Sequence, residues 1–438
     1  MAGIFVSCGP LKRALLTLLI LCSSTPSRAQ ENLVVIVIDQ LTYWATDPAQ
    51  RAPLDLPNLD ALAAQGRRYS RAYATSPVCS ENRLALLSGQ YPFSLGTNKL
   101  APGTPSLGTL LQAAGWETGY IGKWHLSPEG ERAQGLHPQF VEPANRPGWE
   151  TFAGKEGRPH RYFMGKSFRQ SDPTPISTAP WEPAWNTAEA VRFLRAEHER
   201  PFALVVNYGP PHPSQDNGMM PAPIFTAEQI QPRPNVESED RLDAQSRIAA
   251  YLSKVALTDH ELGVLFAEID LTTTFVLLTS DHGEMLLSHG LPSELQKRRP
   301  WQEAARIPLL LAGPGIERGE EAALISTVDL LPSILSLLEV PLPQALQGRA
   351  FPSSRAVYFG HDDDMNSWEG ERWRGLVDGA YKYAVTESGA VEVLFDLEAD
   401  PYELSNLAGD LAHEARLKTL REAIRERARA VGDEFFET

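Results

Sequence analysis

Carboxylate, amide and imidazole side chains stand directly after aliphatic runs in this chain. The pairs Asp39-Gln40 and Asp281-His282 each close such a run. Carboxylate and amide oxygens favour a hard cation such as Ca²⁺ or Mg²⁺, and a single imidazole also admits Mn²⁺. One pair alone would be an ordinary polar exit from a strand. Two pairs that converge predict a divalent cation held by all four side chains.

Cationic and imidazole groups follow two further apolar runs. Lys123 and His125 come after one of them, and His212 lies between prolines after the other. In an open parallel sheet, functional groups gather at the carboxyl ends of the strands. The four runs therefore deliver two aspartates, an amide, a lysine and three histidines to one edge of the predicted sheet.

One cysteine, Cys79, remains once the N-terminal leader is set aside. The leader has two basic residues, an apolar run over 14–22 and the cleavage pattern Ser27-Arg28-Ala29, which predicts a signal peptide over 1–29. We expect an exported protein, either periplasmic or secreted. The apolar run is shorter than the roughly 20 residues of a membrane span, and no later stretch approaches that length, so no membrane span is predicted. A lone thiol in an oxidising compartment is either buried or used chemically.

The elements that must position these groups alternate between short apolar strands and helical patterns. This alternation predicts an α/β fold with a mostly parallel central sheet flanked by helices. A Pro-rich linker over 340–352 separates an α/β domain over 30–345 from a smaller C-terminal α+β domain over 346–438, which we expect to be built on an antiparallel sheet. The expected strands are 33–38, 118–121, 202–207, 273–279, 306–312, 373–377, 381–385 and 392–396, and the expected helices are 59–66, 107–114, 244–269 and 411–430.

The formal net charge of the chain is −15 at pH 7. Nucleic acids and anionic membrane surfaces bind basic faces, so we expect neither as a partner. A small anionic substrate is compatible with this charge, because a few cations in one pocket can bind an anion on an acidic protein.

The ordered motifs resemble those of the formylglycine-dependent sulfatases, a family of the alkaline-phosphatase-like superfamily. The resemblance spans nearly the whole chain past the leader. The segment 77–92 is similar to the nucleophile segment of the family and ends in Leu87-Ser88-Gly89-Gln90-Tyr91-Pro92. Further similar segments are 33–40, 57–62, 122–126, 279–284, 297–308, 381–383 and 394–407.

The resemblance implies a sulfatase, a hydrolase of sulfuric esters. Cys79 would be converted by a maturation enzyme to formylglycine, whose hydrate supplies a hydroxyl nucleophile held against the metal. One hydroxyl would attack sulfur and the second would later expel sulfate. The expected substrate is a sulfated small molecule or saccharide.

The resemblance also implies a role for each candidate residue. Arg83 would steady the hydrate and the metal site, and Lys123 and Lys297 would clamp the sulfate oxygens. His125 would orient or deprotonate the hydrate, and His212 would protonate the leaving alcohol or bind sulfate. The metal ligands would be Asp39, Gln40, Asp281 and His282, with one Ca²⁺ as the first expectation and Mg²⁺ or Mn²⁺ as alternatives.

Two positions depart from the family pattern. The family segment is usually Cys-x-Pro-x-Arg or Cys-x-Ala-x-Arg, whereas Glu81 stands at its middle position in this chain. The maturation enzyme reads this segment as an extended peptide, so a charged side chain could block the conversion of Cys79. Gln40 replaces a second aspartate and removes one negative charge from the metal site.

Three functions therefore stay open. The first is a sulfatase that acts on a sulfate ester, of a carbohydrate or glycosaminoglycan-like substrate. The second is a phosphonate or phosphate ester hydrolase of the same superfamily. The third is a catalytically inactive binder of sulfated ligands, if Cys79 is not converted. The segments 145–169 and 360–374 either border the pocket or are exposed connections.

Overall fold

The computed structural model describes residues 31–128, 136–158, 160–220, 223–291, 296–352, 355–362 and 367–437. The predicted signal peptide, with Cys8 and Cys22, lies outside these residues. Glu31–Thr438 form one compact unit, and the predicted domain boundary after residue 345 stays a prediction. Within the described ranges, no helix is both long and apolar enough to cross a membrane.

A large sheet forms the centre of the structure. Its middle strands run parallel in the order β8 (Thr274–Ser280), β1 (Asn32–Ile38), β7 (Phe202–Tyr208), β3 (Glu117–Lys123) and β4 (Thr151–Lys155). The remaining strands are β10 (Leu309–Ala312), β2 (Arg67–Tyr73), β11 (Gly319–Ser326) and β9 (Arg306–Ile307) beyond β8, and β5 (Lys166–Arg169) and β6 (Ile176–Ser177) beyond β4. β10 runs antiparallel to β8, and β5 runs antiparallel to β4. The sheet is therefore mixed, but its middle strands make it mostly parallel, as predicted.

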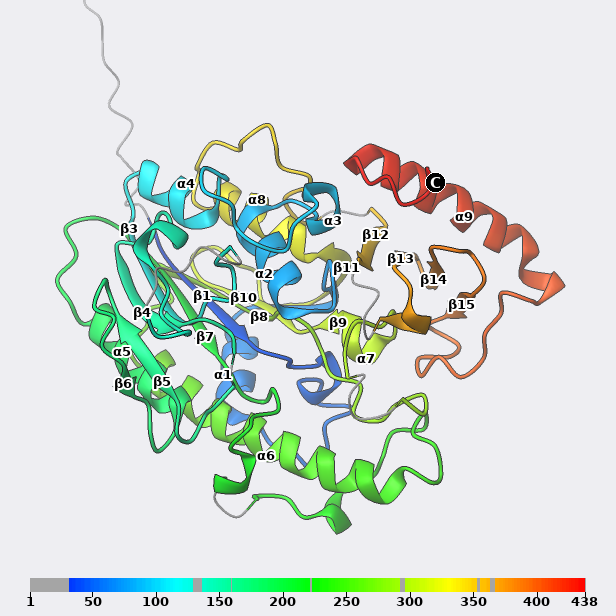
Figure 1. Cartoon of the computed structure of the whole chain (residues 1–438), viewed down its shortest axis with the longest axis horizontal. Helices are drawn as coiled ribbons and strands as arrows, with labels where there is room; N and C mark the ends of the chain where they lie inside the picture. Colours follow the sequence, from blue (N-terminus) through cyan, green and yellow to red (C-terminus); the bar gives the residue numbers. More distant parts are fainter. Residues whose placement is uncertain are drawn as a thin grey trace, which may run out of the picture. The chain divides into compact units, whose positions relative to one another are not determined.

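Helices cover both faces of this sheet, which confirms the predicted fold class (Figure 1). The helices are α1 (Pro57–Gln65), α2 (Cys79–Ser88), α3 (Pro92–Leu95), α4 (Leu107–Ala113), α5 (Glu182–Leu194), α6 (Arg241–Phe266), α7 (Gln302–Ala305), α8 (Leu330–Leu337) and α9 (Glu414–Val431). Successive side chains of a strand point to opposite faces. Val34 and Ile36 of β1 accordingly pack in one core with α1, α5 and α6, whereas Leu33 and Val35 pack in a second core with α2, α4 and α8.

A second sheet lies C-terminal to the first and is antiparallel throughout, as predicted. Its strands are β12 (Val357–His361), β13 (Trp373–Asp378), β14 (Tyr381–Thr386) and β15 (Glu392–Asp396). One of its faces packs on α9 in a cluster that also contains Ala85 of α2 and Tyr91. The segment 77–92 therefore contributes to the core of the second sheet as well as to that of the first.

Two predicted elements end differently in the structure. The expected strand 306–312 is divided into β9 and β10 at Pro308, because a proline has no N–H to donate to a neighbouring strand. The expected helix 411–430 begins with a 3₁₀ turn, Leu411–His413, before α9. In that turn the Asp410 side chain accepts a hydrogen bond from the Ala412 N–H.

Of the two interpretations of the segment 145–169, the structure favours a border of the candidate site, which the segment reaches at His160. It contains β4 and β5, and Trp149, Tyr162 and Phe163 are buried. Trp149 packs edge-on against Tyr120 of β3, with ring centroids 5.2 Å apart. These aromatic residues serve the core, and His160 is the side chain of this segment that reaches the candidate site.

Candidate active site

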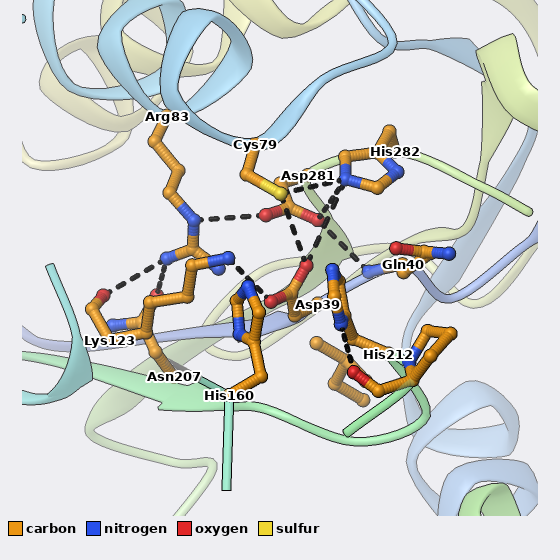
Figure 2. Close-up of polar contacts among 12 residues, drawn as sticks. Asp39, Gln40, Cys79, Arg83, Lys123, His160, Asn207, His212, Asp281 and His282 are labelled. Carbon is orange, nitrogen blue, oxygen red and sulfur yellow. Dashed lines mark hydrogen bonds and ion pairs between the residues drawn. The ribbon is translucent and has the colours of Figure 1, made fainter. Parts of the chain in front are cut away.

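Four neighbouring strands end at one edge of the large sheet, where their following residues converge (Figure 2). Asp39 and Gln40 follow β1, and Asp281 and His282 follow β8. Lys123 is the last residue of β3. The order β8-β1-β7-β3 places these ends side by side, and the N-terminus of α2 brings Cys79 over them.

The two aspartates, His282 and Cys79 each offer a ligand atom, and these atoms lie within 4.8 Å of one another. His282 Nε2 is 3.8 Å from Asp39 Oδ1 and 3.7 Å from Asp281 Oδ1. The His282 Nδ1 lies 2.8 Å from the Gly283 carbonyl oxygen, and a donated Nδ1–H leaves Nε2 to face the carboxylates. Carboxylate oxygens with one imidazole nitrogen are a donor set that fits a hard divalent cation.

Gln40 is tied to this cluster through its backbone as well as its side chain. Its N–H donates to Asp281 Oδ1 at 3.0 Å, and its Oε1 accepts from Lys297 Nζ at 3.3 Å. The residue has a φ of 66°, in the left-handed region that non-glycine residues rarely adopt. This backbone geometry turns the chain sharply after β1, so that both Asp39 and Gln40 face the site.

Cys79 is buried at the first residue of α2, with 2% of its surface exposed. Its Sγ lies 3.1 Å from His282 Nε2 and 3.2 Å from Lys297 Nζ. Burial raises the pKa of the thiol, but Lys123, Lys297 and His282 outweigh burial and hold that pKa well below its ordinary value. The position thus favours an anionic or strongly polarised group directed at the acidic cluster.

Arg83 lies one helical turn after Cys79 and connects three elements. Its Nε donates to Asp281 Oδ2 at 2.9 Å, while its Nη1 donates to the Lys123 carbonyl at 3.1 Å and to Asn207 Oδ1 at 2.6 Å. Burial disfavours the charge, but Asp281 and other acidic partners raise the pKa of the guanidinium above its ordinary value. Arg83 therefore fixes α2 relative to the ends of β8, β3 and β7.

Two lysines face the same centre. Lys123 Nζ donates to Asp39 Oδ2 at 2.6 Å. Lys297 Nζ lies 3.2 Å from both Cys79 Sγ and His212 Nε2. A tetrahedral oxyanion at Cys79 would therefore lie close to two ammonium groups.

The second sheet holds the segment that carries Lys297. Trp373 Nε1 donates to the Arg298 carbonyl at 3.0 Å, and Lys382 Nζ donates to the Pro300 carbonyl at 2.6 Å. The Gln302 N–H donates to a carboxylate oxygen of Glu403 at 2.8 Å. Lys297 is thus placed by contacts from the C-terminal part of the chain and does not belong to a solvated basic patch.

His125 and His212 both lie close to Cys79 and are both neutral in this setting. Burial lowers the pKa of each ring to about 3, with Lys297 adding to the effect on His212 and Lys123 to the effect on His125. His212 Nδ1 lies 2.6 Å from the Pro213 carbonyl, which leaves Nε2 for Lys297. Gly157 gives His125 its room, because a Cβ there would lie 2.5 Å from the ring.

His160 belongs to the segment 145–169, which the sequence left as either a border of the pocket or an exposed connection, and the structure brings its side chain to the centre (Figure 2). Its ring packs against that of His212 in a tilted arrangement with centroids 4.0 Å apart, and both rings lie near Asp39. Two contacts between the loops hold the pair: the Gln215 N–H donates to the His160 carbonyl at 2.9 Å, and Asp216 accepts from three successive N–H groups over 162–164. No motif marks His160, because its position depends on these contacts.

Asn207 also lacked a predicted role. It is a polar residue inside the otherwise apolar strand β7, and its Nδ2 donates to the Ile121 carbonyl at 3.1 Å while its Oδ1 receives Arg83. An amide in a buried strand was the signal that could have identified it, since buried polar groups need partners.

Glu81, the departure from the family pattern, points away from Cys79 and is buried. Its Oε2 accepts hydrogen bonds from the Ser76 hydroxyl and from His361 Nδ1, the latter at 3.0 Å. Burial raises the pKa of the Glu81 carboxyl, but His361 and Ser76 outweigh burial and hold that pKa below its ordinary value. The charged Glu81 side chain therefore has a hydrogen-bonding partner in the folded protein, His361, which is the last residue of β12.

Comparisons with known proteins agree with this geometry. Residues 31–340 match the family model "Sulfatase", and residues 290–430 match "N-sulphoglucosamine sulphohydrolase, C-terminal". The chain is 27% identical over 428 residues to an ulvan-active sulfatase of Formosa agariphila, covering 92% of this chain and 82% of that protein.

Solved structures share the fold. The sulfatase homologue YidJ of Bacteroides fragilis superposes with a TM-score of 0.80 at 22% identity, covering 94% of this chain and 98% of that one. A structure in complex with its substrate D-glucosamine-2-N,6-O-disulfate superposes with a TM-score of 0.77 at 20% identity, covering 92% and 98% of the two chains. The family model spans well over half of the chain, and the relatives are sulfuric ester hydrolases. The chain therefore belongs to the sulfatase family, within the alkaline-phosphatase-like superfamily.

Proposed function

We propose that this enzyme is an exported sulfatase that hydrolyses a sulfate ester of a saccharide and uses a formylglycine derived from Cys79. The single observation that carries the proposal is the setting of Cys79 Sγ, which lies 3.1 Å from His282 Nε2 and 3.2 Å from Lys297 Nζ above two carboxylates. That setting combines a nucleophile position, a cation site and an anion clamp.

The residues present fit both groups that the family implies. Asp39, Asp281 and His282 converge as buried donors for one divalent cation, Ca²⁺ by preference with Mg²⁺ or Mn²⁺ as alternatives, and Gln40 adds an amide oxygen. Arg83 Nη2 is buried without a partner among the described residues, which suits an additional acceptor at this point. When bound, the cation lowers the pKa of the hydroxyl on the converted residue and neutralises charge on the sulfuryl group.

The side chains of this chain divide the remaining work. Lys123 and Lys297 bind sulfate oxygens, and their charges stabilise the negative charge that develops on those oxygens in the transition state. Arg83 holds Asp281 and α2 in a fixed position relative to each other. His125, beside Cys79, orients the converted residue and accepts a proton from it.

His212 donates a proton to the oxygen of the leaving alcohol. Its ring is neutral in the free enzyme, because burial and Lys297 lower its pKa to about 3. An anionic sulfate ester placed between the lysines offsets their charge and raises the pKa of the ring. Nε2 can then hold a proton and pass it to the departing alcohol.

Several observations support a sulfated saccharide as the substrate. The protein carries a net charge of −15, yet its site gathers cations. One relative is an ulvan-active sulfatase, and one similar protein was solved with its substrate D-glucosamine-2-N,6-O-disulfate. Both proteins act on sulfated sugars. The partners of this chain would be that saccharide and the enzyme that matures Cys79.

The test begins with the state of Cys79. Trypsin releases the peptide 72–83 from protein made in its native host, and the peptide mass distinguishes thiol from aldehyde. We expect the aldehyde, together with hydrolysis of 4-nitrophenyl sulfate that falls on chelation and in Asp281→Ala. A wholly unmodified thiol would refute the sulfatase mechanism and leave a binder of sulfated ligands. Faster hydrolysis of phosphonate or phosphate esters would favour the second function.

A further inference from the structure

The sulfur of unconverted Cys79 lies among the donors of the proposed cation site. Its side chain and those of Asp39, Asp281 and His282 are each at most 2% exposed. Cys79 Sγ lies 3.1 Å from His282 Nε2 and 3.6 Å from Asp39 Oδ1. His282 Nε2 lies 3.8 Å from Asp39 Oδ1 and 3.7 Å from Asp281 Oδ1. A thiol at this position is therefore a fourth potential ligand of the same buried cluster.

These separations fit four ligands around one small cation. Zinc binds thiolate sulfur at about 2.3 Å, and imidazole nitrogen or carboxylate oxygen at about 2.0–2.2 Å, usually in a tetrahedron. The edge of a tetrahedron is about 1.6 times the distance from its centre to a corner, so neighbouring zinc ligands lie about 3.3–3.8 Å apart. The four separations run from 3.1 to 3.8 Å, which leaves only small movements for a zinc ion to bind all four side chains.

The outer atoms of the other three ligands are already held by hydrogen bonds. Lys123 Nζ donates to Asp39 Oδ2 at 2.6 Å, and Arg83 Nε donates to Asp281 Oδ2 at 2.9 Å. Both Oδ1 atoms are thereby left to the cluster. His282 Nδ1 lies 2.8 Å from a backbone carbonyl oxygen, which leaves the lone pair of Nε2 for a metal. Such outer contacts orient metal ligands, and losing one typically costs about 10–100-fold in metal affinity.

The chemical state of residue 79 decides which metal this cluster prefers. Thiolate is a soft ligand that suits Zn²⁺, whereas the hydroxyl oxygens of a formylglycine hydrate suit hard cations such as Ca²⁺ and Mg²⁺. Lys297 Nζ, 3.2 Å from Cys79 Sγ, stabilises the thiolate, which is the form that binds metals.

We propose that the unconverted protein holds Zn²⁺ in a four-coordinate site made of the Cys79 thiolate, His282, Asp39 and Asp281. Conversion of Cys79 replaces the sulfur by oxygen and returns the cluster to hard cations. The inference goes beyond the proposed function, because it concerns the chain that still carries a thiol.

The test uses protein made in a host that lacks the maturation enzyme, with the thiol verified by the mass of the peptide 72–83. Co²⁺ serves as a coloured probe for the Zn²⁺ site. We expect a thiolate-to-cobalt charge-transfer band in the near ultraviolet, which Cys79→Ser should lack. In competition with a chromophoric chelator, Zn²⁺ should bind the thiol form at least about 100-fold tighter than Cys79→Ser, the upper end of what an outer contact contributes. The Ca²⁺ affinities of the two proteins should differ by less than about threefold, because a hard cation gains little from sulfur.

His289→Ala is the matched control, because His289 lies with Glu303 and Glu403 in another group of potential ligands. It should leave the Zn²⁺ affinity unchanged, and a loss there equal to that in Cys79→Ser would overturn the assignment to Cys79. If Cys79→Ser does not fold, the converted protein from the native host replaces it as the sulfur-free comparison. Equal Zn²⁺ affinities with and without the sulfur, or a cobalt spectrum without the charge-transfer band, would overturn the site. A converted protein that hydrolyses no sulfate ester would instead refute the proposed function and leave the zinc site in place.

Discussion

The pairing of Glu81 with His361 makes a sharp prediction about stability. Removing the imidazole in His361→Ala leaves a buried carboxylate whose remaining hydrogen-bonding partner, within the described part of the chain, is the Ser76 hydroxyl. Leaving a buried carboxylate without its hydrogen-bonding partner costs about 3–5 kcal/mol, more than for a neutral group, because the buried charge is left uncompensated. Glu81→Gln keeps an oxygen for Ser76 and should cost less, about 1–3 kcal/mol.

The assay is thermal unfolding. At roughly 2.1 cal/mol/K per residue, a cooperative unit of about 400 residues has an unfolding entropy of about 0.9 kcal/mol/K. His361→Ala should therefore lower Tm by about 3–6 °C. In the double variant the losses should be less than additive, with a coupling of about 1.5–3 kcal/mol.

The exposed pair of His413 and Asp410 provides a matched control. Its Nδ1 to Oδ2 distance is 3.0 Å, equal to that of the buried pair, but its side chains are 28% and 47% exposed. His413→Ala should leave Tm unchanged, since solvent screens an exposed pair. A His361→Ala protein that melts within 1 °C of the wild type, or additive losses in the double variant, would refute the assigned role of burial.

The pH dependence of this pair has a definite sign. The pKa of Glu81 is lowered in the folded protein, so its contribution is present above the unfolded value of about 4.3 and is lost as pH falls through the folded value. The Tm difference between wild type and Glu81→Gln should shrink below about pH 4.

Three further predictions concern the active site. Arg83→Lys keeps the charge but cannot bridge Asp281, Asn207 and the Lys123 carbonyl, so kcat/KM per mole of formylglycine should fall about 100-fold; a loss below threefold would contradict the bridging role. Chelation should lower the Tm of the wild type by about 3 °C, the effect of about 2.7 kcal/mol from a cation at 100 times its Kd, and should not lower that of Asp281→Ala. His160→Ala should reduce kcat/KM for sulfate esters about tenfold, while His160→Phe, which can still pack against His212, should recover part of it; equal losses would show that the ring contact is irrelevant.

The fold could be predicted largely from hydrophobic periodicity. β1 is a continuous aliphatic run because both faces of its sheet are covered by helices, and such runs are read easily from sequence. The same logic located the groups at the ends of β1, β3 and β8, since the carboxyl ends of parallel strands share one edge. The division of the strand at Pro308 was the kind of detail that a short apolar run conceals.

The residues that sequence reasoning missed share a physical cause. His160 reaches the centre because Asp216 and Gln215 hold two loops together, and His361 pairs with Glu81 across 280 residues of chain. Neither contact leaves a local pattern of spacing. Trp149, Tyr162 and Phe163 of the segment 145–169 are buried, and their residue types alone do not distinguish a core position from the border of a pocket.

The burial of Glu81 bears on the order of events during synthesis. Its partner His361 is made 280 residues later, which at about 5–20 residues per second is roughly 14–56 s of translation. Throughout that interval the segment around Cys79 has neither its imidazole partner nor the second sheet against which α2 packs. Until β12 has been synthesised, residues 79–83 can therefore remain an extended peptide. This interval ends when His361 of β12 pairs with Glu81.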